Sequence, residues 1–535
     1  MSTGTTGKLS GSAQTWTEDL AELEARRERA LEMGGPDRVK GEHERGRLTA
    51  RERIDLLLDK GSFQEVGKLA TMTVRGPDGK VQKTLPASQI CGFGTVNRRR
   101  VAVVAEDYSV ARGPQTIYLE KDKGVFGTPG YIEQLAYTWE IPLVAFLQST
   151  GGDVSIQESL DYQYMPNGMN VSPLVELLDR VPMVTAVMGP VAGSSAGRAV
   201  CSHFSLFSRP NGALFAGGPP LVERSLGQKL DKFELGGYKI HTQAMGSIDN
   251  GCDTEEEVVA QIKTFLSYLP DNVHQLPPRL APEDPPDRSC DELLDIVPNH
   301  PRRVFDVRAM LECVFDRGSF FEIGPEWGRA LITGFARLGG VTIGVLASDA
   351  RHSGGAMTVT AADKQTRFAD LCDLFHVPMV YFSDNPGLML GADAERGGVL
   401  RKGLRAAQAL HGATVPVITI QVRRVFGVGG WMTGSPTQLS VKLCWPSAIL
   451  GDMPVEGGVA ASFGKEIAAA PDPKAKQREI EERMLAKTSV WQTAEHFGLE
   501  DVIDPRETRR ALHRWLEGAL YTLRAGPKVG PKYRP

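Results

Sequence analysis

The chain has 535 residues, of which 61 are Lys or Arg and 65 are Asp or Glu, for a net charge of -4. This length exceeds what one ordinary hydrophobic core serves, so we expect two large domains. The charge balance gives no reason to expect a nucleic-acid partner. No apolar run reaches the roughly 18 residues of a membrane span, and the N-terminus lacks a signal-peptide pattern. We therefore expect a cytoplasmic protein with no membrane partner.

The seven cysteines are odd in number and scattered singly, without a CxxC pair. Neither a structural zinc site nor a disulfide framework is therefore expected. We predict buried free thiols and no metal bound by this chain. The cysteines are Cys91, Cys201, Cys252, Cys290, Cys313, Cys372 and Cys444.

Capping-box signatures locate helix starts along the chain, because a threonine and a glutamate three residues later satisfy free N–H groups of the first turn. Between these helices, apolar strand-like runs occur at 92–107, 141–152 and from 181 onward. Alternation of strands and helices indicates an α/β layer. The signatures are Thr15-x-x-Glu18, Thr49-x-x-Glu52 and Thr254-x-x-Glu257.

Residues 415–432, VPVITIQVRRVFGVGGWM, combine a β-branched run with a glycine-rich end. This pattern predicts a buried strand that ends in a loop or a helix start. Glycines there allow backbone N–H groups to approach a ligand and to face a developing negative charge. A second copy, VPMVTAVMGPVAGSSAG, begins at Val181, and an offset of 234 superposes Gly193 on Gly427.

Other segments repeat in the same order. DKGSFQEVG at Asp59 returns as DRGSFFEIG at Asp316, and GFGTVNRRRVAVVAED at Gly92 returns as GFARLGGVTIGVLASD at Gly334. IPLVAFLQSTGG matches VPMVYFSDNPG, which aligns Gly151 with Gly387. Such colinear matches predict a tandem duplication of one α/β domain. Six prolines between 270 and 286 exclude a helix or central strand there, so we place the connection there, with domains at 1–276 and 277–535.

Neither glycine turn is a P-loop or a G-x-G-x-x-G motif. GSSAG matches a hydrolase elbow with Ser195 as nucleophile, but no His or acid partner can be identified, and the second copy lacks a serine there. We therefore favour packing or ligand contact for Ser194 and Ser195. Two backbone oxyanion pockets suit a reaction in which a carbonyl oxygen on each of two substrates gains charge, such as carboxyl transfer from carboxybiotin to an acyl thioester.

Longer stretches support a resemblance over nearly the whole chain. They include HERGRLTARERIDLLLDKGSF at His43, ELGGYKIHT at Glu234, FLSYLPDN at Phe265, FDRGSFFEIG at Phe315, NPGLMLGADAE at Asn385 and WPSAILGDMPVEGGV at Trp445. The chain resembles the carboxyltransferase (beta) subunits of biotin-dependent acyl-CoA carboxylases, the propionyl-CoA and methylcrotonyl-CoA carboxylase group. The resemblance implies an α/β fold of two tandem crotonase-like (ββα-superhelix) domains, the first binding acyl-CoA and the second biotin.

The resemblance also implies an active site between the N domain of one subunit and the C domain of another, in a homo-hexamer built as a trimer of dimers. The chain has no A-M-K-M biotin acceptor and no ATP-binding half, so carboxybiotin must come from a partner, a biotin carboxylase or biotin carboxyl carrier subunit. By family position, the catalytic amides belong to Gly193, Ser194, Val428 and Gly429, and the substrate-binding residues are Gly151, Gly152, Gly427, Gly430 and Trp431.

Departures from the family pattern concern the acyl end. The loop STGGDVSIQES places Asp153 where a small residue is usual and lacks the usual arginine. Trp431 stands where the family tunes its acyl pocket, and we hypothesise that it selects the acyl group, with packing alone as the alternative. Arg423 and Arg424 could meet CoA phosphates or carboxylate, or belong to a solvated or ion-paired surface. For His43 and His241, which lack metal-ligand spacing, we expect structural roles.

Two alternative functions remain open from the sequence. An acyl-CoA decarboxylase carboxyltransferase catalyses the reverse reaction on the same fold, and a sodium-pumping membrane partner would distinguish it. A non-catalytic scaffold subunit is favoured by the STGGD loop and Ser194, and disfavoured by the glycine turn at Gly427 and the NPG loop. A single-domain hydratase or isomerase fits less well.

Overall fold

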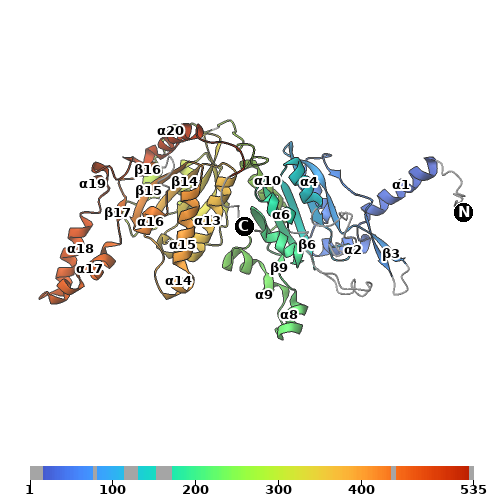
Figure 1. Cartoon of the computed structure of the whole chain (residues 1–535), viewed down its shortest axis with the longest axis horizontal. Helices are drawn as coiled ribbons and strands as arrows, with labels where there is room; N and C mark the ends of the chain where they lie inside the picture. The colour runs from blue at the N-terminus through green and yellow to red at the C-terminus, as the bar shows by residue number, and fades with distance from the viewer. Residues whose placement is uncertain are drawn as a thin grey trace, which may run out of the picture.

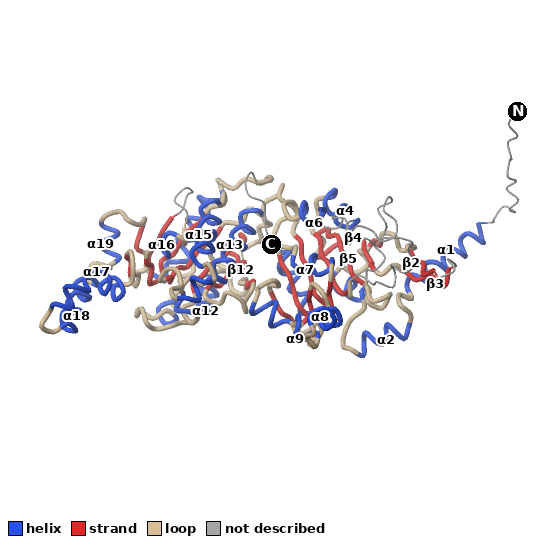
Figure 2. The backbone as a smooth tube through the Cα atoms, turned by 60° about the horizontal axis from the view of Figure 1, so that its bottom comes forward, coloured by secondary structure: helices blue, strands red, loops and turns tan. Residues whose placement is uncertain are grey.

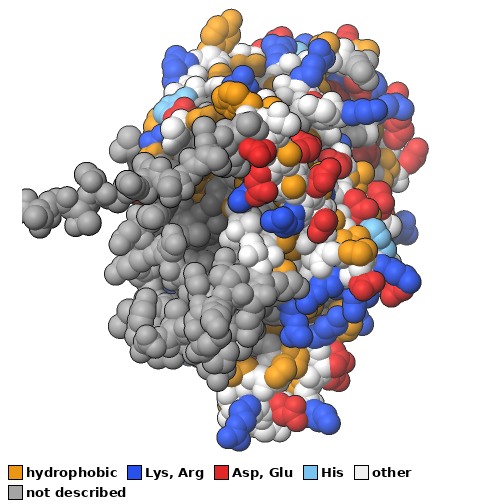
Figure 3. All heavy atoms as spheres, turned by 90° about the vertical axis from the view of Figure 1, so that its right-hand side faces the viewer, with side chains coloured by type: hydrophobic (Ala, Val, Ile, Leu, Met, Phe, Trp, Pro, Cys, Tyr) orange, Lys and Arg blue, Asp and Glu red, His pale blue; other side chains and the backbone are white. Residues whose placement is uncertain are grey.

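The computed structural model describes residues 16–75, 81–113, 131–151, 172–282, 284–434 and 441–528. Two mixed sheets with covering helices lie side by side along the long axis, one in each half of the chain (Figure 1). Within the described ranges, no helix is both long and apolar enough to cross a membrane. The end at which α1 lies carries acidic and basic side chains on the same face (Figure 3).

The first half contains these elements: α1 (Trp16–Leu31), α2 (Pro36–Glu44), α3 (Ala50–Leu57), β1 (Gln64–Glu65), β2 (Thr71–Arg75), β3 (Val81–Pro86), β4 (Gln89–Val96), β5 (Arg99–Glu106), α4 (Tyr131–Trp139), β6 (Leu143–Ser149), α6 (Ser172–Leu177), β7 (Met183–Ala192), α7 (Ser194–Val200), β8 (Phe204–Ser208), β9 (Ala213–Phe215), α8 (Pro219–Leu226), α9 (Lys232–Gly236), the π-helix η2 (Lys239–Ala244), β10 (Asn250–Cys252) and α10 (Glu255–Tyr268).

The second half contains these elements: α11 (Leu293–Ile296), α12 (Val307–Val314), β11 (Phe321–Ile323), β12 (Leu331–Leu338), β13 (Val341–Ser348), the 3-10 helix η3 (Ser353–Gly355), α13 (Val359–Leu374), β14 (Met379–Asn385), α14 (Ala392–Arg396), α15 (Val399–Gly412), β15 (Val417–Phe426), α16 (Val428–Trp431), β16 (Val441–Cys444), β17 (Ile449–Gly451), α17 (Val455–Ala469), α18 (Pro473–Leu485), α19 (Val490–Glu495), β18 (Asp501–Val502), the 3-10 helix η4 (Pro505–Glu507) and α20 (Thr508–Leu520).

The two sheets share one topology. The strand order is β1-β4-β5-β6-β7-β8-β10 in the first and β11-β12-β13-β14-β15-β16-β18 in the second, with β9 beside β7 and β17 beside β15. In each sheet the first two pairings are antiparallel and the pairings that follow are parallel. A register shift at Leu147/Ser149 recurs at Ser383/Asn385. The predicted tandem duplication is therefore confirmed.

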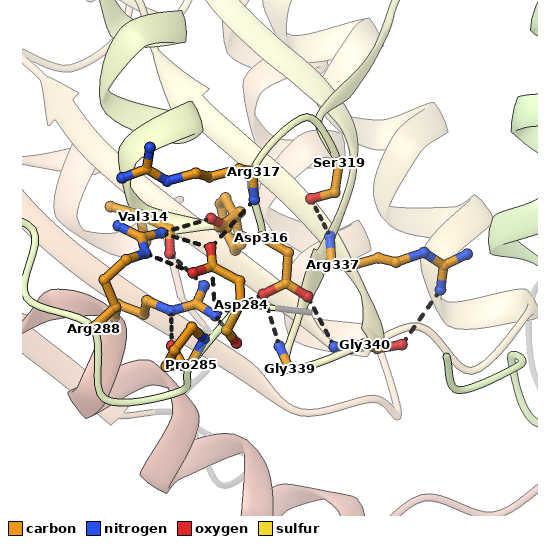
Figure 4. A network of polar contacts seen from close by, with 12 residues as sticks. Asp284, Pro285, Arg288, Val314, Asp316, Arg317, Ser319, Arg337, Gly339 and Gly340 are labelled. Carbon is orange, nitrogen blue, oxygen red and sulfur yellow. Dashed lines mark hydrogen bonds and ion pairs between the residues drawn. The ribbon is translucent and has the colours of Figure 1, made fainter. Parts of the chain in front are cut away.

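The repeated D-x-G-S-F motif serves a structural purpose. Asp316 accepts hydrogen bonds from the N–H groups of Gly339 and Gly340 at 3.1 and 2.9 Å, at the β12–β13 turn (Figure 4). Ser319 Oγ accepts the N–H of Arg337 at 3.0 Å. In the first half Asp59 likewise accepts from the turn between β4 and β5. The motif thus clamps the antiparallel hairpin of each sheet.

The C-terminal helix is tied to this second clamp. The guanidinium of Arg509, on α20, is fully buried and donates to the carboxylate of Asp316 at 2.7 Å and to three backbone carbonyls. Two of these carbonyls, those of Asp284 and Pro285, belong to the proline-rich segment. The clamp therefore joins the C-terminal helix, the connecting segment and the second sheet.

The predicted helix caps can be compared with the structure at two of three positions. Thr49 and Glu52 form a reciprocal capping box on α3. The side chain of Thr254 accepts the N–H of Glu257 at the start of α10. Thr15 lies outside the described residues. These threonines set helix starts that carry the flanking helices against the first sheet.

The two halves meet through aromatic rings and polar side chains. Phe265 and Tyr268 of α10 pack on Phe335 of β12 with ring centroids 6.0 and 5.6 Å apart. Arg367 of α13 pairs with Asp249 of the first half. No helix or strand lies between α10 and α11 in the described part of the proline-rich segment, as its prolines predict. The domain boundary at 276/277 stays a prediction.

The cysteine side chains are as predicted, except that one of them is only half-buried. All seven cysteines are free, and six are buried, with Cys201 half-buried. The β2–β3 hairpin and the α17–α18 pair were not predicted from the sequence. The latter projects at the far end of the second half (Figures 1 and 2) and packs around its own small cluster of Val455, Val459 and Ile480.

Candidate functional site

The first glycine turn joins β7 to α7. Gly193 follows the buried end of β7 with φ 66° and ψ -131°, a conformation that favours glycine, and caps α7. Gly193 and Ser194 are exposed, whereas Ser195 is buried. A strand that ends in such a residue turns abruptly into a helix, so the first N–H groups of the helix face outward from the sheet edge.

The second turn repeats this geometry between β15 and α16. Gly427 has φ 52° and ψ -125°, and residues 427–431 show the same sequence of exposed and buried positions as 193–197. β15 continues through both arginines to Phe426. The prediction of a strand running into a glycine turn is confirmed in both halves.

The turns differ in which N–H groups have protein acceptors. Gly427 donates its N–H to the carbonyl of Gly451 at 2.9 Å, and Gly430 donates to Gly427 at 3.1 Å. Across the described residues, no protein acceptor is recorded for the N–H groups of Val428 and Gly429, nor for those of residues 193–195. In the second turn, the N–H groups available to a ligand are therefore those of Val428 and Gly429. In the first turn they start at Gly193, which matches Gly427 and so lies one position earlier.

Each turn lies against the loop after the neighbouring strand. Beside the first, Gly151 (φ 81°) donates its N–H to Ser149 Oγ at 3.2 Å. Beside the second, Gly387 (φ 113°) donates to Asn385 Oδ1 at 2.8 Å. A Cβ on Gly429 would stand 2.7 Å from the carbonyl of Asn385, so this position excludes any side chain.

Gly151 aligns with Gly387 in the sequence, but Asn385 and Gly387 were not among the predicted site residues. The signal that could have found them is the polar end of the apolar run MVYFSDN. Of the other predicted residues, Gly152 lies outside the described residues, as does Asp153.

The hydroxyl of Ser195 points away from solvent. Its Oγ donates to Glu106 Oε1 at 2.7 Å, and both residues are buried. Burial raises the pKa of Glu106, while the Ser195 hydroxyl, the nearby Arg198 and the N–H of Gln148 each lower it. A serine that is bonded to a buried carboxyl, and not to a histidine base, is unsuited to the hydrolase elbow. The structure thus agrees with a packing role.

Arg423 and Arg424 form ion pairs beneath the second turn. Arg423 is buried, contacts Asp384 Oδ2 at 2.6 Å and lies 4.7 Å from the ring centroid of Phe305. Arg424 Nε contacts Asp384 Oδ1 at 2.8 Å. Of the two interpretations that the sequence left open, the ion pair is the one observed. Asp384 immediately precedes Asn385, so both arginines anchor the loop beside Gly429.

Trp431 closes α16 with 47% of its surface exposed, next to Val428 at 40%. Its indole meets the ring of His411 edge-on at 5.2 Å, and its carbonyl oxygen lies 2.9 Å from His411 Nε2. The indole is therefore held from one side and open on the other. It belongs to the same short helix, Val428–Trp431, as the amides of Val428 and Gly429.

The two other histidines singled out earlier have structural contacts. His43 Nε2 lies 3.0 Å from Glu52 at the α3 cap. His241 bridges Ser247 Oγ and the carbonyl of Leu214 at 2.8 and 2.7 Å. Their predicted structural roles are confirmed. In the described part of the chain, no group of three His, Cys, Asp or Glu side chains is arranged to hold a metal ion.

The duplicated turns and their supporting loops span most of the chain, and residues 41–526 match the family described as the carboxyl transferase domain. The chain belongs to the carboxyl transferase family. This carboxyltransferase is 34% identical over 503 residues to the propionyl-CoA carboxylase carboxyltransferase subunit of Haloferax mediterranei, covering 93% of this chain and 95% of that one. It is 31% identical over 535 residues to the methylmalonyl-CoA carboxyltransferase 12S subunit of Propionibacterium freudenreichii subsp. shermanii, covering 98% of each.

A solved structure gives the same result for the fold. The transcarboxylase 12S hexamer with methylmalonyl-coenzyme A and methylmalonic acid bound superposes with a TM-score of 0.85 at 27% identity, covering 99% of each chain. The carboxyltransferase therefore has the expected α/β fold of two tandem crotonase-like domains. The resemblance noted from the sequence is confirmed, and with it an enzyme of the carboxyltransferase class that serves biotin-dependent acyl-CoA carboxylases.

Proposed function

We propose that this carboxyltransferase transfers a carboxylate from carboxybiotin, carried on a partner protein, to the α or vinylogous carbon of an acyl-CoA. The observation that carries the proposal is the pair of matching glycine turns, each with backbone N–H groups that have no protein acceptor within the described part of the chain. Preorganised donors of this kind stabilise oxygen atoms on which negative charge develops, and the loss of one commonly lowers a rate by about 10²–10³.

In the first half, the amides of Gly193 and Ser194 hold the thioester oxygen of the acyl-CoA. When the α-proton leaves, this oxygen gains charge, and the two N–H groups stabilise it there. Gly151 lies against the same turn, because a Cβ on Gly193 would stand 3.6 Å from its Cα. We assign Gly151 and Gly152 to the walls of the acyl site. The exposure of residues 193 and 194 supports this assignment.

In the second half, the amides of Val428 and Gly429 hold the ureido oxygen of biotin. Carboxybiotin, when bound there, would supply the carboxylate and a ureido nitrogen able to take the α-proton, so no side-chain base of this chain would be required. The fit is supported by the two N–H groups, which have no protein acceptor among the described residues, and by Gly429, whose close approach to Asn385 leaves no room for a side chain. Gly427 provides the turn, and Gly430 closes it with its own hydrogen bond.

The active site forms between subunits. In Figure 2 the labels of α7 and α16 lie well apart along the long axis, which supports a site shared between subunits. The surface around α16 also exposes large apolar side chains on the neighbouring helix and loop, which a second subunit would cover. They are Leu390 at 81%, Leu400 at 64% and Leu404 at 58% exposure. We infer a homo-hexamer, a trimer of dimers, of the kind solved for the 12S transcarboxylase.

Trp431 selects the acyl group. Its half-exposed indole stands beside the amide of Val428 and is braced by His411. Such a rigid aromatic surface limits the room for an acyl chain without a large entropic cost. The supporting observation is that the indole is not part of the core, which makes packing alone a poor account of it.

The test mixes the purified chain with a biotin carboxylase and carrier subunit, ATP, labelled bicarbonate and a panel of acyl-CoA esters. We expect label in the acyl-CoA, and none when the carrier lacks biotin. Transfer only from carboxyacyl-CoA to the carrier would support the decarboxylase alternative. If no carboxylate is transferred in either direction with any carrier subunit of the host, the non-catalytic scaffold alternative is supported.

A further inference from the structure

Glu106 connects strand β6 and helix α7, the two segments beside the first-half site. It is the last residue of β5, and 1% of its surface is exposed. Its Oε1 accepts the Ser195 hydroxyl at 2.7 Å, and its Oε2 accepts the backbone N–H of Gln148 at 2.7 Å. Ser195 is the second residue of α7, and Gln148 is the penultimate residue of β6. One buried carboxyl therefore fixes both segments.

The contact on β6 continues to the neighbouring glycine. Ser149 follows Gln148, and its Oγ accepts the N–H of Gly151 at 3.2 Å. The Gln148 side chain is itself held, because its Oε1 accepts Arg53 at 2.8 Å and its Nε2 donates to Glu42 at 2.7 Å. The end of β6 thus has little freedom, and Glu106 transmits this constraint to α7.

The charged groups near Glu106 and Gln148 occur as pairs. Arg198 of α7, whose charge acts on Glu106, pairs with Glu133, and Arg53, which contacts the Gln148 side chain, pairs with Glu255 at 2.7 Å. Glu106 is held by two uncharged donors, a hydroxyl and an amide. Burying a carboxyl is costly unless hydrogen bonds satisfy it, and a satisfied buried network rigidifies its surroundings. This carboxyl therefore favours one fixed arrangement of β5, β6 and α7.

The second half has no such pair. The position that matches Ser195 is Gly429, and the position that matches Glu106 is Ser348. There, Gly429 approaches the carbonyl of Asn385 so closely that no side chain fits. The second turn is thus held by backbone packing, whereas the first turn, with Ser195 in place of the glycine, is held through a side chain.

We propose that Glu106 and Ser195 are positioning residues that hold the N–H groups of Gly193 and Ser194 in line for the acyl thioester oxygen. Ser195 directly follows Ser194, so its hydrogen bond to Glu106 fixes the orientation of the first turn of α7. The inference rests on the proposed function of these two amides. It explains the serine at 195, which the nucleophile interpretation does not.

Substitutions at both ends of the hydrogen bond test the proposal. Ser195→Ala leaves Glu106 Oε1 without its donor, and Glu106→Ala removes both bonds. We expect each to lower kcat about tenfold or more with the KM for acyl-CoA changed less than about twofold, because an interaction needed mainly in the transition state is weakened. Glu106→Gln should restore activity to within about threefold of wild type, since its amide oxygen can accept Gln148 and its amide group can donate to the Ser195 hydroxyl.

A matched control is Thr185→Val. Thr185 Oγ1 donates to the carbonyl of Ala199 at 2.8 Å and is buried, so this variant removes a hydroxyl that holds the other end of α7. We expect it to lower the melting temperature as Ser195→Ala does but to leave kcat unchanged. If Thr185→Val lowers kcat as much as Ser195→Ala, or if Ser195→Ala leaves kcat unchanged, the positioning role is wrong.

A second readout does not depend on activity. Hydrogen exchange of the peptide covering 190–200 should be faster in Ser195→Ala at its N-terminal amides, and in Thr185→Val only toward residue 200. If the wild-type protein does not catalyse carboxyl transfer, the proposed function is wrong, and the exchange pattern can still be measured. Active wild-type protein with unchanged exchange in Ser195→Ala would overturn the positioning role alone.

Discussion

Gly193 and Gly427 stand 234 positions apart in the sequence and share one backbone conformation, with φ 66° and ψ -131° in the first and φ 52° and ψ -125° in the second. Both follow a ten-residue buried strand, and both begin a short helix. Their surroundings differ: a Cβ on Gly427 would stand 2.6 Å from the carbonyl of Asp452, whereas a Cβ on Gly193 would meet nothing closer than 3.6 Å.

Alanine at these two positions should therefore have unequal effects. Gly193→Ala introduces backbone strain of about 1–3 kcal/mol and should lower kcat with a small loss of stability. Gly427→Ala adds a steric clash with backbone, and we expect a larger fall in melting temperature as well as lost activity. Thermal unfolding of both variants measures the difference. A larger fall for Gly193→Ala would contradict this account of the two turns.

Trp431→Ala should change the preference among acyl-CoA esters. Removing the half-exposed indole beside Val428 enlarges the room next to α16, and a change of this kind in an apolar pocket alters relative kcat/KM by about 10–200-fold. The ratios of kcat/KM across chain lengths are the measurement. Trp491→Ala, at a tryptophan with 54% exposure on α19, is the matched control and should leave the ratios unchanged. An unchanged preference in Trp431→Ala would contradict the assignment of Trp431 to acyl-group selection.

The two arginines beneath the second turn should contribute unequally to stability. Arg423→Met leaves Asp384 buried with only one partner, and breaking a buried pair costs about 3–5 kcal/mol. Arg424 is 21% exposed, so Arg424→Met should cost about 1 kcal/mol or less. Denaturant unfolding of the two variants distinguishes them. Equal losses would show that burial does not govern this pair of contacts.

The buried His203 should make the protein sensitive to acid. Burial lowers its pKa from 6.5 to about 3, with the nearby Arg367 adding to the effect and a hydrogen bond to the carbonyl of Leu178 opposing it. Its Nδ1 accepts the N–H of Met183 at 3.0 Å and its Nε2 lies 2.9 Å from Leu178 O. Protonation would therefore place two N–H groups against each other.

Between pH 6.5 and about 3, the unfolded chain binds a proton on His203 that the folded chain does not. The free energy of unfolding should then fall as the pH is lowered, by about 1.4 kcal/mol per pH unit from this group. His203→Gln should lack this component. The test is the difference in stability between wild type and variant, measured from pH 7.5 to 4.5. A difference that stays constant with pH would contradict the assignment.

Strand ends, helix starts and the duplication could be predicted because the sequence patterns that indicate them are local. A β-branched run followed by glycine marks a strand end, and Thr49 with Glu52 marks a helix start. The repeated order of such signals revealed the duplication. What could not be predicted was the role of charged residues within those patterns. Arg423 and Glu106 stand in apolar strands, and nothing in the neighbouring sequence names Asp384 or Ser195 as their partners.

The sequence by itself thus determined the duplicated α/β halves and the positions of their glycine turns, because periodicity, capping and glycine placement depend on residues a few positions apart. Its resemblance to the carboxyltransferase subunits implied the crotonase-like fold and the family. Only the tertiary structure decided which amides remain unpaired, that Arg423 is buried against Asp384, and that Ser195 bonds to Glu106, 89 residues away. Those contacts are set by strand register and helix packing, which bring distant segments together only in the folded chain.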